Sequence, residues 1–196
     1  MNSPLELLYL ITFCGILAVA YSYLLSGQIL SSSPGNDKMK EIASAIQIGA
    51  KAYLNRQYKT IAIVGFIVLI IVTYFFNILV GIGYFVGAFL SGVAGYVGML
   101  ISVKANVRTA EASRKSLQAG LNIAFKSGAI TGLLVAGLAL LAIAIYYLIL
   151  INLNTSSRDI INALVALGIL AIFLTGGYAY LDYVATTTSK KLMEKF

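Results

Sequence analysis

A long stretch without charge is the feature that most constrains this chain: from Ile61 to Val103 no Asp, Glu, Lys or Arg occurs. At about 1.5 Å per residue, a helix of this length is roughly twice as long as the 30 Å hydrocarbon core of a bilayer. The stretch therefore predicts two membrane-spanning helices. Asn77, Gly81 and Gly83 form its only cluster of turn-forming residues, which places the reversal there.

Three further apolar stretches bring the predicted number of spans to about five. The chain is 60% hydrophobic and 11% charged, whereas soluble domains carry roughly 25% charged residues. We therefore expect one all-α domain over residues 1–196, an integral membrane helical bundle surrounded by lipid. Its spans are expected at about residues 5–30, 58–77, 82–103, 127–151 and 160–184, with polar connectors at about 31–57 and 104–126.

The first apolar stretch has a second interpretation, as a secretory signal peptide. Ala18, Val19 and Ala20 have the small residues of a cleavage site. However, no Lys or Arg precedes the stretch, and Glu6 does, which is untypical of a signal peptide. We expect a membrane helix here.

The polar connectors also contain helix signals. A breaker of Ser, Pro and Gly residues ends at Asn36 and Asp37, either of which is able to cap a second helix. The first part of that helix, up to about residue 59, is amphipathic and is expected to project from the membrane. Residues 104–126 are rich in helix formers and are expected to be largely helical.

Basic residues lie almost wholly on one side of this topology. Both connectors and the C-terminal tail are rich in Lys and Arg, whereas the other side has only Arg158, with Glu6 and Asp159. The positive-inside rule then predicts a multi-pass protein of the cell membrane with its N-terminus outside and its C-terminus in the cytoplasm. The net charge of +7 is explained by this orientation, and no nucleic-acid partner is expected.

The residue inventory excludes several kinds of chemistry. The chain has one cysteine, Cys14, and no histidine, which excludes disulfides, zinc sites and His-dependent nucleophiles. No Gly-x4-Gly-Lys-Ser/Thr phosphate loop occurs. Asp182, near the end of the fifth span among tyrosines, is either a weak candidate metal ligand or an ordinary interfacial carboxylate.

Small residues recur four apart in the third and fourth spans. Such stripes allow helices to approach closely in lipid, so we predict helix packing there. A glycine-lined ion pathway would need membrane-embedded charge, which these spans lack. The predicted packing residues are Gly83, Gly87, Ser91, Gly95, Gly128 and Gly132.

Two stretches at the span boundaries, Ile42–Thr60 and Gly98–Leu134, have a specific polar pattern that hydrophobicity alone does not generate. Together with the order of spans, they resemble the membrane-integral inorganic pyrophosphatases, which couple pyrophosphate hydrolysis to H⁺ or Na⁺ transport. The residues that carry the resemblance are Gln47, Tyr53, Arg56, Asn106, Arg108, Thr109 and Glu111.

The resemblance implies that this chain corresponds to the N-terminal five-helix portion of such a pump, where the helices are mostly scaffold. It also implies that the full-length family uses Mg²⁺, and that the chain has the remainder of a pump, or further copies of itself, as partners. Pyrophosphate is a ligand only through this resemblance.

The sequence departs from the family in two places. Ile48 stands where the family often has an acid, and the signature Asp-x7-Lys-x-Glu is incomplete. Asp182 and Lys190 have its spacing, but Thr186 stands at its inner Asp and Leu192 at its Glu. We therefore assign no catalytic, cofactor-binding or metal residue, and we expect no cofactor in this chain alone.

The hypothesis is a truncated, split or degenerate scaffold portion of a pyrophosphate-energised pump, without its own hydrolytic site. Whether the chain is an enzyme stays open. The alternative is a non-catalytic membrane interaction or assembly protein that uses Arg108, Arg114 and Lys115 for a partner or anionic lipid. A small transporter would need polar groups within the membrane that these spans lack.

Overall fold

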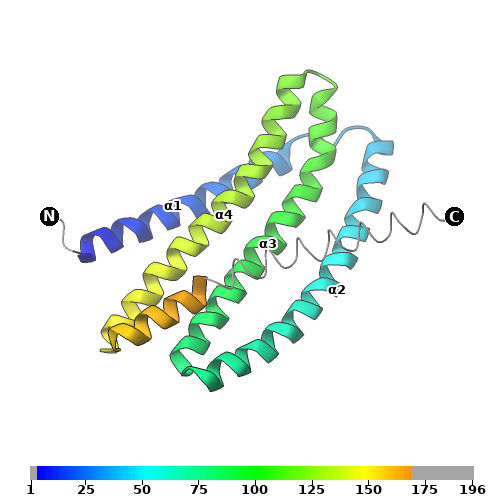
Figure 1. Cartoon of the computed structure of the whole chain (residues 1–196). Helices are drawn as coiled ribbons and strands as arrows, with labels where there is room; N and C mark the ends of the chain where they lie inside the picture. The colour runs from blue at the N-terminus through cyan, green and yellow to red at the C-terminus, as the bar shows by residue number, and fades with distance from the viewer. Residues whose placement is uncertain (1–3, 169–196) are drawn as a thin grey trace.

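Long helices make up the structure, a computed structural model that describes residues 4–168. The helices are α1 (Pro4–Ser31), α2 (Asp37–Phe75), α3 (Ile78–Ser113) and α4 (Leu117–Asn152), shown in Figure 1. Residues 157–168 form a further helix. All four long helices are apolar and long enough to cross a membrane. The predicted all-α membrane bundle is confirmed.

Short polar side chains determine where three of these helices start. Asn36 accepts a hydrogen bond from the Met39 N–H at 2.9 Å, and Asn77 accepts one from the Val80 N–H at 2.9 Å. At the start of α4, the Ser116 hydroxyl accepts a hydrogen bond from the Ala119 N–H at 3.1 Å. Each cap satisfies one backbone donor that the first turn of a helix leaves free. The predicted start of the second helix is therefore confirmed.

The reversal between α2 and α3 is shorter than the glycines suggested. Only Phe76 and Asn77 separate the two helices, and Gly81 and Gly83 lie within α3. Since the Asn77 cap starts α3 directly, the turn needs no glycine. Gly81 instead faces Thr73 of α2, where a Cβ would collide with the threonine hydroxyl.

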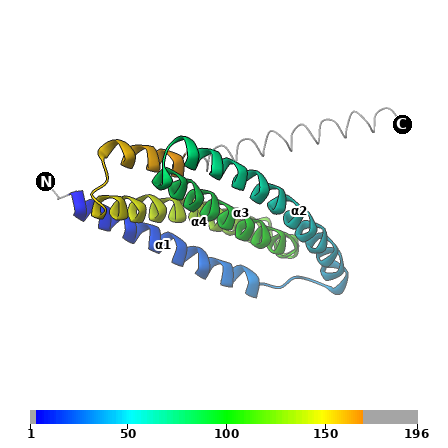
Figure 2. The same ribbon diagram turned by 90° about the horizontal axis from the view of Figure 1, so that it is seen from below.

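The four long helices lie in the spatial order α1, α4, α3, α2: α4 packs against both α1 and α3, and among these four α2 packs only on α3. Figure 2 shows α1 and the helix 157–168 on opposite sides of α4. Buried side chains form two clusters. One joins α3, α4 and the helix 157–168 through Val80, Ala142, Tyr146, Leu150, Ala163 and Leu167. The other joins α1, α3 and α4 through Leu25, Ile29, Ala105 and Ile130.

Close backbone approach occurs at two helix crossings. An ideal Cβ on Gly83 would lie 2.6 Å from the Ala163 carbonyl oxygen, and one on Gly87 would collide with the Leu167 carbonyl oxygen. At the α1–α4 crossing, a Cβ on Gly137 would lie 3.0 Å from the Gly15 carbonyl oxygen. At all three glycines a side chain would force the helices apart.

The remaining predicted packing residues have different surroundings. A Cβ on Gly95 would lie 2.9 Å from the Tyr58 hydroxyl, and Ser91 is half-buried on α3. Gly128 and Gly132 have no atom of the described residues within 4 Å of an ideal Cβ. Helix association through the whole set of six stays a prediction.

Replacing Gly87 with leucine is expected to destabilise the bundle by about 1–3 kcal/mol, the usual cost of overpacking. The new side chain would meet rigid backbone rather than a movable side chain. The free energy of unfolding in detergent measures the effect.

The matched control is Gly27→Leu, because Gly27 has nothing within 4 Å of an ideal Cβ. It should leave the free energy of unfolding unchanged or slightly improved, since leucine favours helix more than glycine does. Equal values for the two variants would refute the packing role of Gly87.

Candidate functional site

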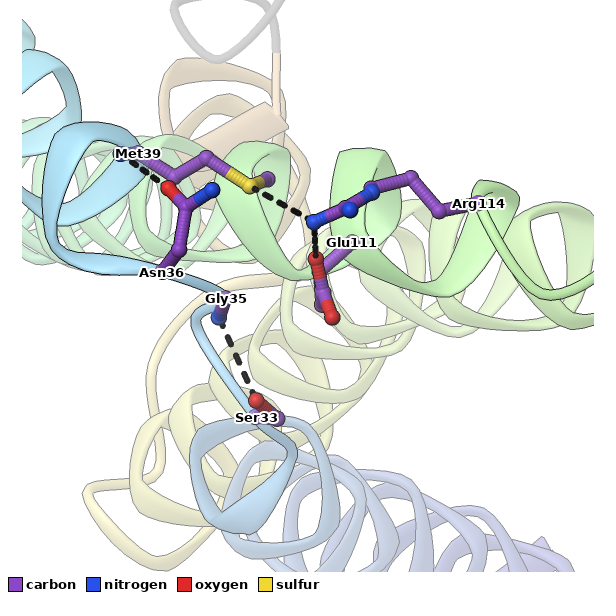
Figure 3. A network of polar contacts seen from close by, with 6 residues as sticks. All are labelled: Ser33, Gly35, Asn36, Met39, Glu111 and Arg114. Atoms are coloured by element: carbon purple, nitrogen blue, oxygen red, sulfur yellow. Dashed lines mark hydrogen bonds and ion pairs between the residues drawn. The ribbon is translucent and has the colours of Figure 1, made fainter.

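A polar cluster lies at the end of the bundle that contains the α1–α2 loop and the α3–α4 turn. Figure 3 shows six of its residues: Ser33, Gly35, Asn36, Met39, Glu111 and Arg114. Gly35 has a φ of +84°, a left-handed conformation that favours glycine. Its N–H donates to the Ser33 hydroxyl at 3.2 Å. This bend carries the chain from α1 into the Asn36 cap of α2.

Glu111 of α3 holds the bend from the other side. Its Oε2 would lie 3.0 Å from a Cβ on Gly35, so the carboxylate lies directly against the loop. Arg114 donates to the same Oε2 at 3.1 Å, and the Glu111 side chain is only 19% exposed. Arg114 Nη1 also lies 4.0 Å from the Met39 sulfur of α2. Glu111 and Arg114 therefore join α3 to the α1–α2 loop.

Arg108, one turn before Glu111, binds the end of α1. Its Nε donates to the Ser32 carbonyl at 3.1 Å and its Nη2 to the Leu30 carbonyl at 3.1 Å, while Nη1 donates to the Lys104 carbonyl at 2.7 Å. The last carbonyls of a helix have no partner within the helix and carry its negative dipole. A guanidinium suits them because its donors diverge in a fixed plane.

A second contact binds α1 to α4. Lys126 donates to the Gln28 side-chain oxygen at 3.1 Å. The end of α1 is therefore held from α3 by Arg108 and from α4 by Lys126.

The other residues of the predicted boundary motifs lie outside this cluster. Gln47, Tyr53 and Arg56 lie further along α2, beginning about 12 Å past Met39 along the helix axis. Gln47 is half-buried, and Tyr53 and Arg56 are exposed. On α3, Asn106 is exposed and Thr109 is half-buried. Asp182, the weak metal candidate, lies outside the described residues.

A polar site at the opposite end of the bundle was missed by the sequence interpretation. Asp159 accepts hydrogen bonds from the Asn77 amide at 3.0 Å and from the Ser156 hydroxyl at 2.7 Å. The Asp159 N–H donates in turn to the Ser156 hydroxyl. The spacing from Ser156 to Asp159 resembles a capping box, which was the available signal. Its bond to Asn77 joins the α2–α3 turn to the helix 157–168.

The chain also matches known protein sequences. Residues 16–176 match the family described as inorganic H⁺ pyrophosphatase. The chain belongs to this family. Since its relatives are membrane pumps and its four long helices suit membrane crossing, it is an integral membrane protein.

The most similar relatives include a K(+)-insensitive pyrophosphate-energized proton pump of Methanosarcina mazei, 41% identical over 146 residues. The match covers 74% of this chain and 22% of that pump. A Bacteroides thetaiotaomicron protein, whose name describes a K(+)-stimulated pyrophosphate-energized sodium pump, is 41% identical over 150 residues. There the match covers 74% of this chain and 20% of the relative. The chain thus spans about a fifth of the length of these pumps.

The family's chemistry implies Mg²⁺, and the described residues do not fit a magnesium site. Mg²⁺ at a phosphate site takes carboxylate oxygens in octahedral geometry. Within residues 4–168 no three His, Cys, Asp or Glu residues are grouped to hold a metal ion. Glu111 is paired with Arg114, Asp37 with Lys40, and the Asp159 carboxylate accepts hydrogen bonds from Asn77 and Ser156. We derive no hydrolytic step from these carboxylates.

Replacing Arg108 with glutamine should destabilise the C-terminal end of α1. The change removes a charged donor to three carbonyls, and hydrogen bonds from charged groups contribute about 1.5–3 kcal/mol each to stability when buried. Because the Arg108 side chain is only half-buried, we expect a total loss of about 1–3 kcal/mol. Hydrogen–deuterium exchange should rise at residues 28–36.

Arg56→Gln is the matched control, because Arg56 is exposed on α2. It should change neither the unfolding free energy nor the exchange of residues 28–36. Unchanged exchange in Arg108→Gln would show that the α1 end is held without the guanidinium.

Proposed function

We propose that this chain supplies helical membrane scaffold to a pyrophosphate-energised H⁺ or Na⁺ pump and does not itself form the hydrolytic site. The observation that carries the proposal is the match of most of the chain to about a fifth of such pumps. In the full-length pump, Mg²⁺ and pyrophosphate would be bound by other parts. The partner is then the remainder of a pump, or further copies of this chain.

The use of the polar side chains supports a scaffold role. Of the residues in the family-like boundary motifs, Arg108 and Glu111 bind the α1 end and the α1–α2 loop. Hydrolysis of pyrophosphate needs metal ions on the phosphate oxygens and a positioned base for the attacking water. A carboxylate already paired with Arg114 suits neither task, whereas it suits fixing two helices at their ends.

The alternative, an interaction or assembly protein, would use Arg108, Arg114 and Lys115 for a partner or for anionic lipid. Arg108 and Arg114 instead direct donors to partners within the chain. Arg114 is still 61% exposed and Lys115 is exposed, but Arg108 is committed to the end of α1, which favours the scaffold proposal.

We also propose the orientation with the N-terminus outside and the C-terminus in the cytoplasm, with five spans at about the predicted positions. In support, most of the described Lys and Arg residues lie in the α1–α2 and α3–α4 connections or in the parts of the helices beside them, and Arg56 and Lys59 lie near the middle of α2, whereas only Arg158 lies at the opposite end. These two connections lie at the same end of the bundle (Figure 1). Cytoplasmic loops carry such an excess of basic residues.

The purified chain alone is expected not to hydrolyse pyrophosphate, even with abundant Mg²⁺, because the described carboxylates form no metal site. Phosphate release would be measured in lipid vesicles, for the chain alone and with Asp182→Asn alongside. Phosphate release should appear when the rest of a pump is co-expressed.

Turnover by the chain alone that Asp182→Asn abolishes would overturn the scaffold proposal and make Asp182 a metal ligand. Turnover that survives Asp182→Asn would equally contradict the proposal and place the site elsewhere in this chain.

The orientation is tested by single cysteines in a background without Cys14. Cysteines at Asn2 and Asn154 should react with a membrane-impermeant reagent added outside intact cells, and one at Ser189 should not. Labelling at Ser189 from outside would disprove either the five-span count or the orientation. Labelling of all three after membrane disruption is the control for accessibility.

A further inference from the structure

An apolar groove of about 550 Å³ lies between α2 and α3. Its lining residues all belong to α2 and α3, and among the four long helices α2 packs only on α3. Within the part of the chain that the structure describes, the groove therefore lies on the side of the bundle away from α1, where α2 is the outermost helix (Figure 1). Small residues make room for it, among them Ala62 and Gly65 on α2 and Ala88 and Gly92 on α3. Aromatic rings form much of its wall, with Phe66 63% exposed and Phe85 and Phe89 stacked at 6.2 Å.

The groove offers no free polar group to an occupant. Its three tyrosine hydroxyls all have partners: Tyr58 donates to the Gly92 carbonyl at 2.9 Å, Tyr84 to the Gly65 carbonyl at 3.0 Å and Tyr96 to the Asn55 side-chain oxygen at 3.5 Å. These bonds also join α2 to α3 and keep the two walls in place. An occupant must therefore be apolar along its whole length.

The groove is at least as long as one leaflet of the hydrocarbon core is thick. On α3 its lining runs from Tyr84 to Val97, about 20 Å along the axis, against roughly 15 Å for half of the hydrocarbon core. One end is marked by Tyr58 and Tyr96, whose rings make an edge contact at 5.2 Å. Tyrosines gather at the membrane–water interface, so this end lies near the headgroups.

Beyond the tyrosine end of the groove, each of its two helices carries a lysine. Lys51 lies on the same helical row of α2 as Tyr58, Ala62 and Gly65, about 10 Å past Tyr58. Because the helices are antiparallel, Lys104 of α3 extends the opposite wall to a similar level, about 12 Å past Tyr96.

Lys59 directly follows Tyr58 on α2. All three lysines are exposed, and none forms an ion pair within residues 4–168. Long lysine side chains reach back toward the interface, where lipid phosphates lie.

We propose that the α2–α3 groove is a binding site for an anionic phospholipid of the leaflet on the lysine side. One acyl chain lies along the apolar groove, and the phosphate is bound by Lys51, Lys59 and Lys104. The apolar lining and the cationic end together match the two halves of such a lipid, which neither a second apolar helix nor a soluble anion does.

Tryptophan fluorescence tests the proposal directly, because the chain contains no tryptophan. Phe66→Trp places the only tryptophan on the groove wall, and Phe13→Trp places it on α1, where Phe13 is 56% exposed. Each variant is reconstituted in phosphatidylcholine vesicles with a small, varied fraction of brominated-chain phosphatidylglycerol or brominated-chain phosphatidylcholine. Bromine quenches tryptophan only at close range.

We expect Phe66→Trp to be quenched preferentially by the brominated phosphatidylglycerol, with an apparent preference of roughly fivefold or more over phosphatidylcholine. Phe13→Trp should be quenched equally by both lipids, in proportion to their fraction. A triple variant that combines Phe66→Trp with Lys51→Gln and Lys104→Gln should lose the preference for phosphatidylglycerol, so that the ratio of the two lipids' quenching falls to about one. The control pair, Lys38→Gln with Lys115→Gln, makes the same charge change away from the groove and should keep it.

Filling the groove provides a second, independent variant. Ala62→Leu adds bulk at an exposed groove position and should lower the quenching of Phe66→Trp by both brominated lipids, whereas Ala139→Leu, on the exposed surface of α4, should not. Equal quenching of Phe66→Trp by the two lipids would refute the anionic site. Quenching of Phe66→Trp well below that of Phe13→Trp would show that protein covers the groove, which also overturns the proposal.

Discussion

The structure depends first on the absence of water in the hydrocarbon core of a bilayer, where each backbone N–H and C=O must find its partner within the protein. Helices satisfy that requirement locally, and the few polar side chains of the spans follow the same rule. Tyr84 and Tyr146 donate to backbone carbonyls of neighbouring helix segments, and Thr73 donates to a carbonyl of its own helix. Among the described residues no buried side-chain nitrogen or oxygen lacks a hydrogen-bond partner.

Because lipid tails are as apolar as leucine, the helices gain little from hydrophobic burial and associate by close packing and hydrogen bonds. Glycines allow that approach at the crossing of α1 with α4 and at the contact of α3 with residues 157–168. Hydrogen bonds from tyrosines then join α2 to α3. The polar clusters at the two ends of the bundle, around Arg108 and Asp159, fix the connections where water replaces lipid.

Within residues 4–168 the carboxylates are not gathered into a metal site, and the charged groups there have structural uses. Charged groups at the helix ends, such as Glu111, are used to hold loops and helix termini. Within residues 4–168, Lys51 and Lys104 form no ion pair, and their places beyond one end of the α2–α3 groove suit a lipid phosphate. The scaffold proposal and the lipid site are therefore separable, because they depend on different residues.

The sequence by itself determined the features that local spacing encodes: the helical membrane class, a helix cap at Asn36 or Asp37, and the family, through polar motifs at the helix boundaries. It also placed Gly83 and Gly87 in a packing stripe, without indicating which helix they meet. Only the tertiary structure decided the partners, such as the carbonyls bound by Arg108. It likewise decided the groove between α2 and α3. The reason is that hydropathy and capping act within one helix, whereas partners and grooves depend on which helices lie side by side, a sum of weak contacts between residues far apart in the chain.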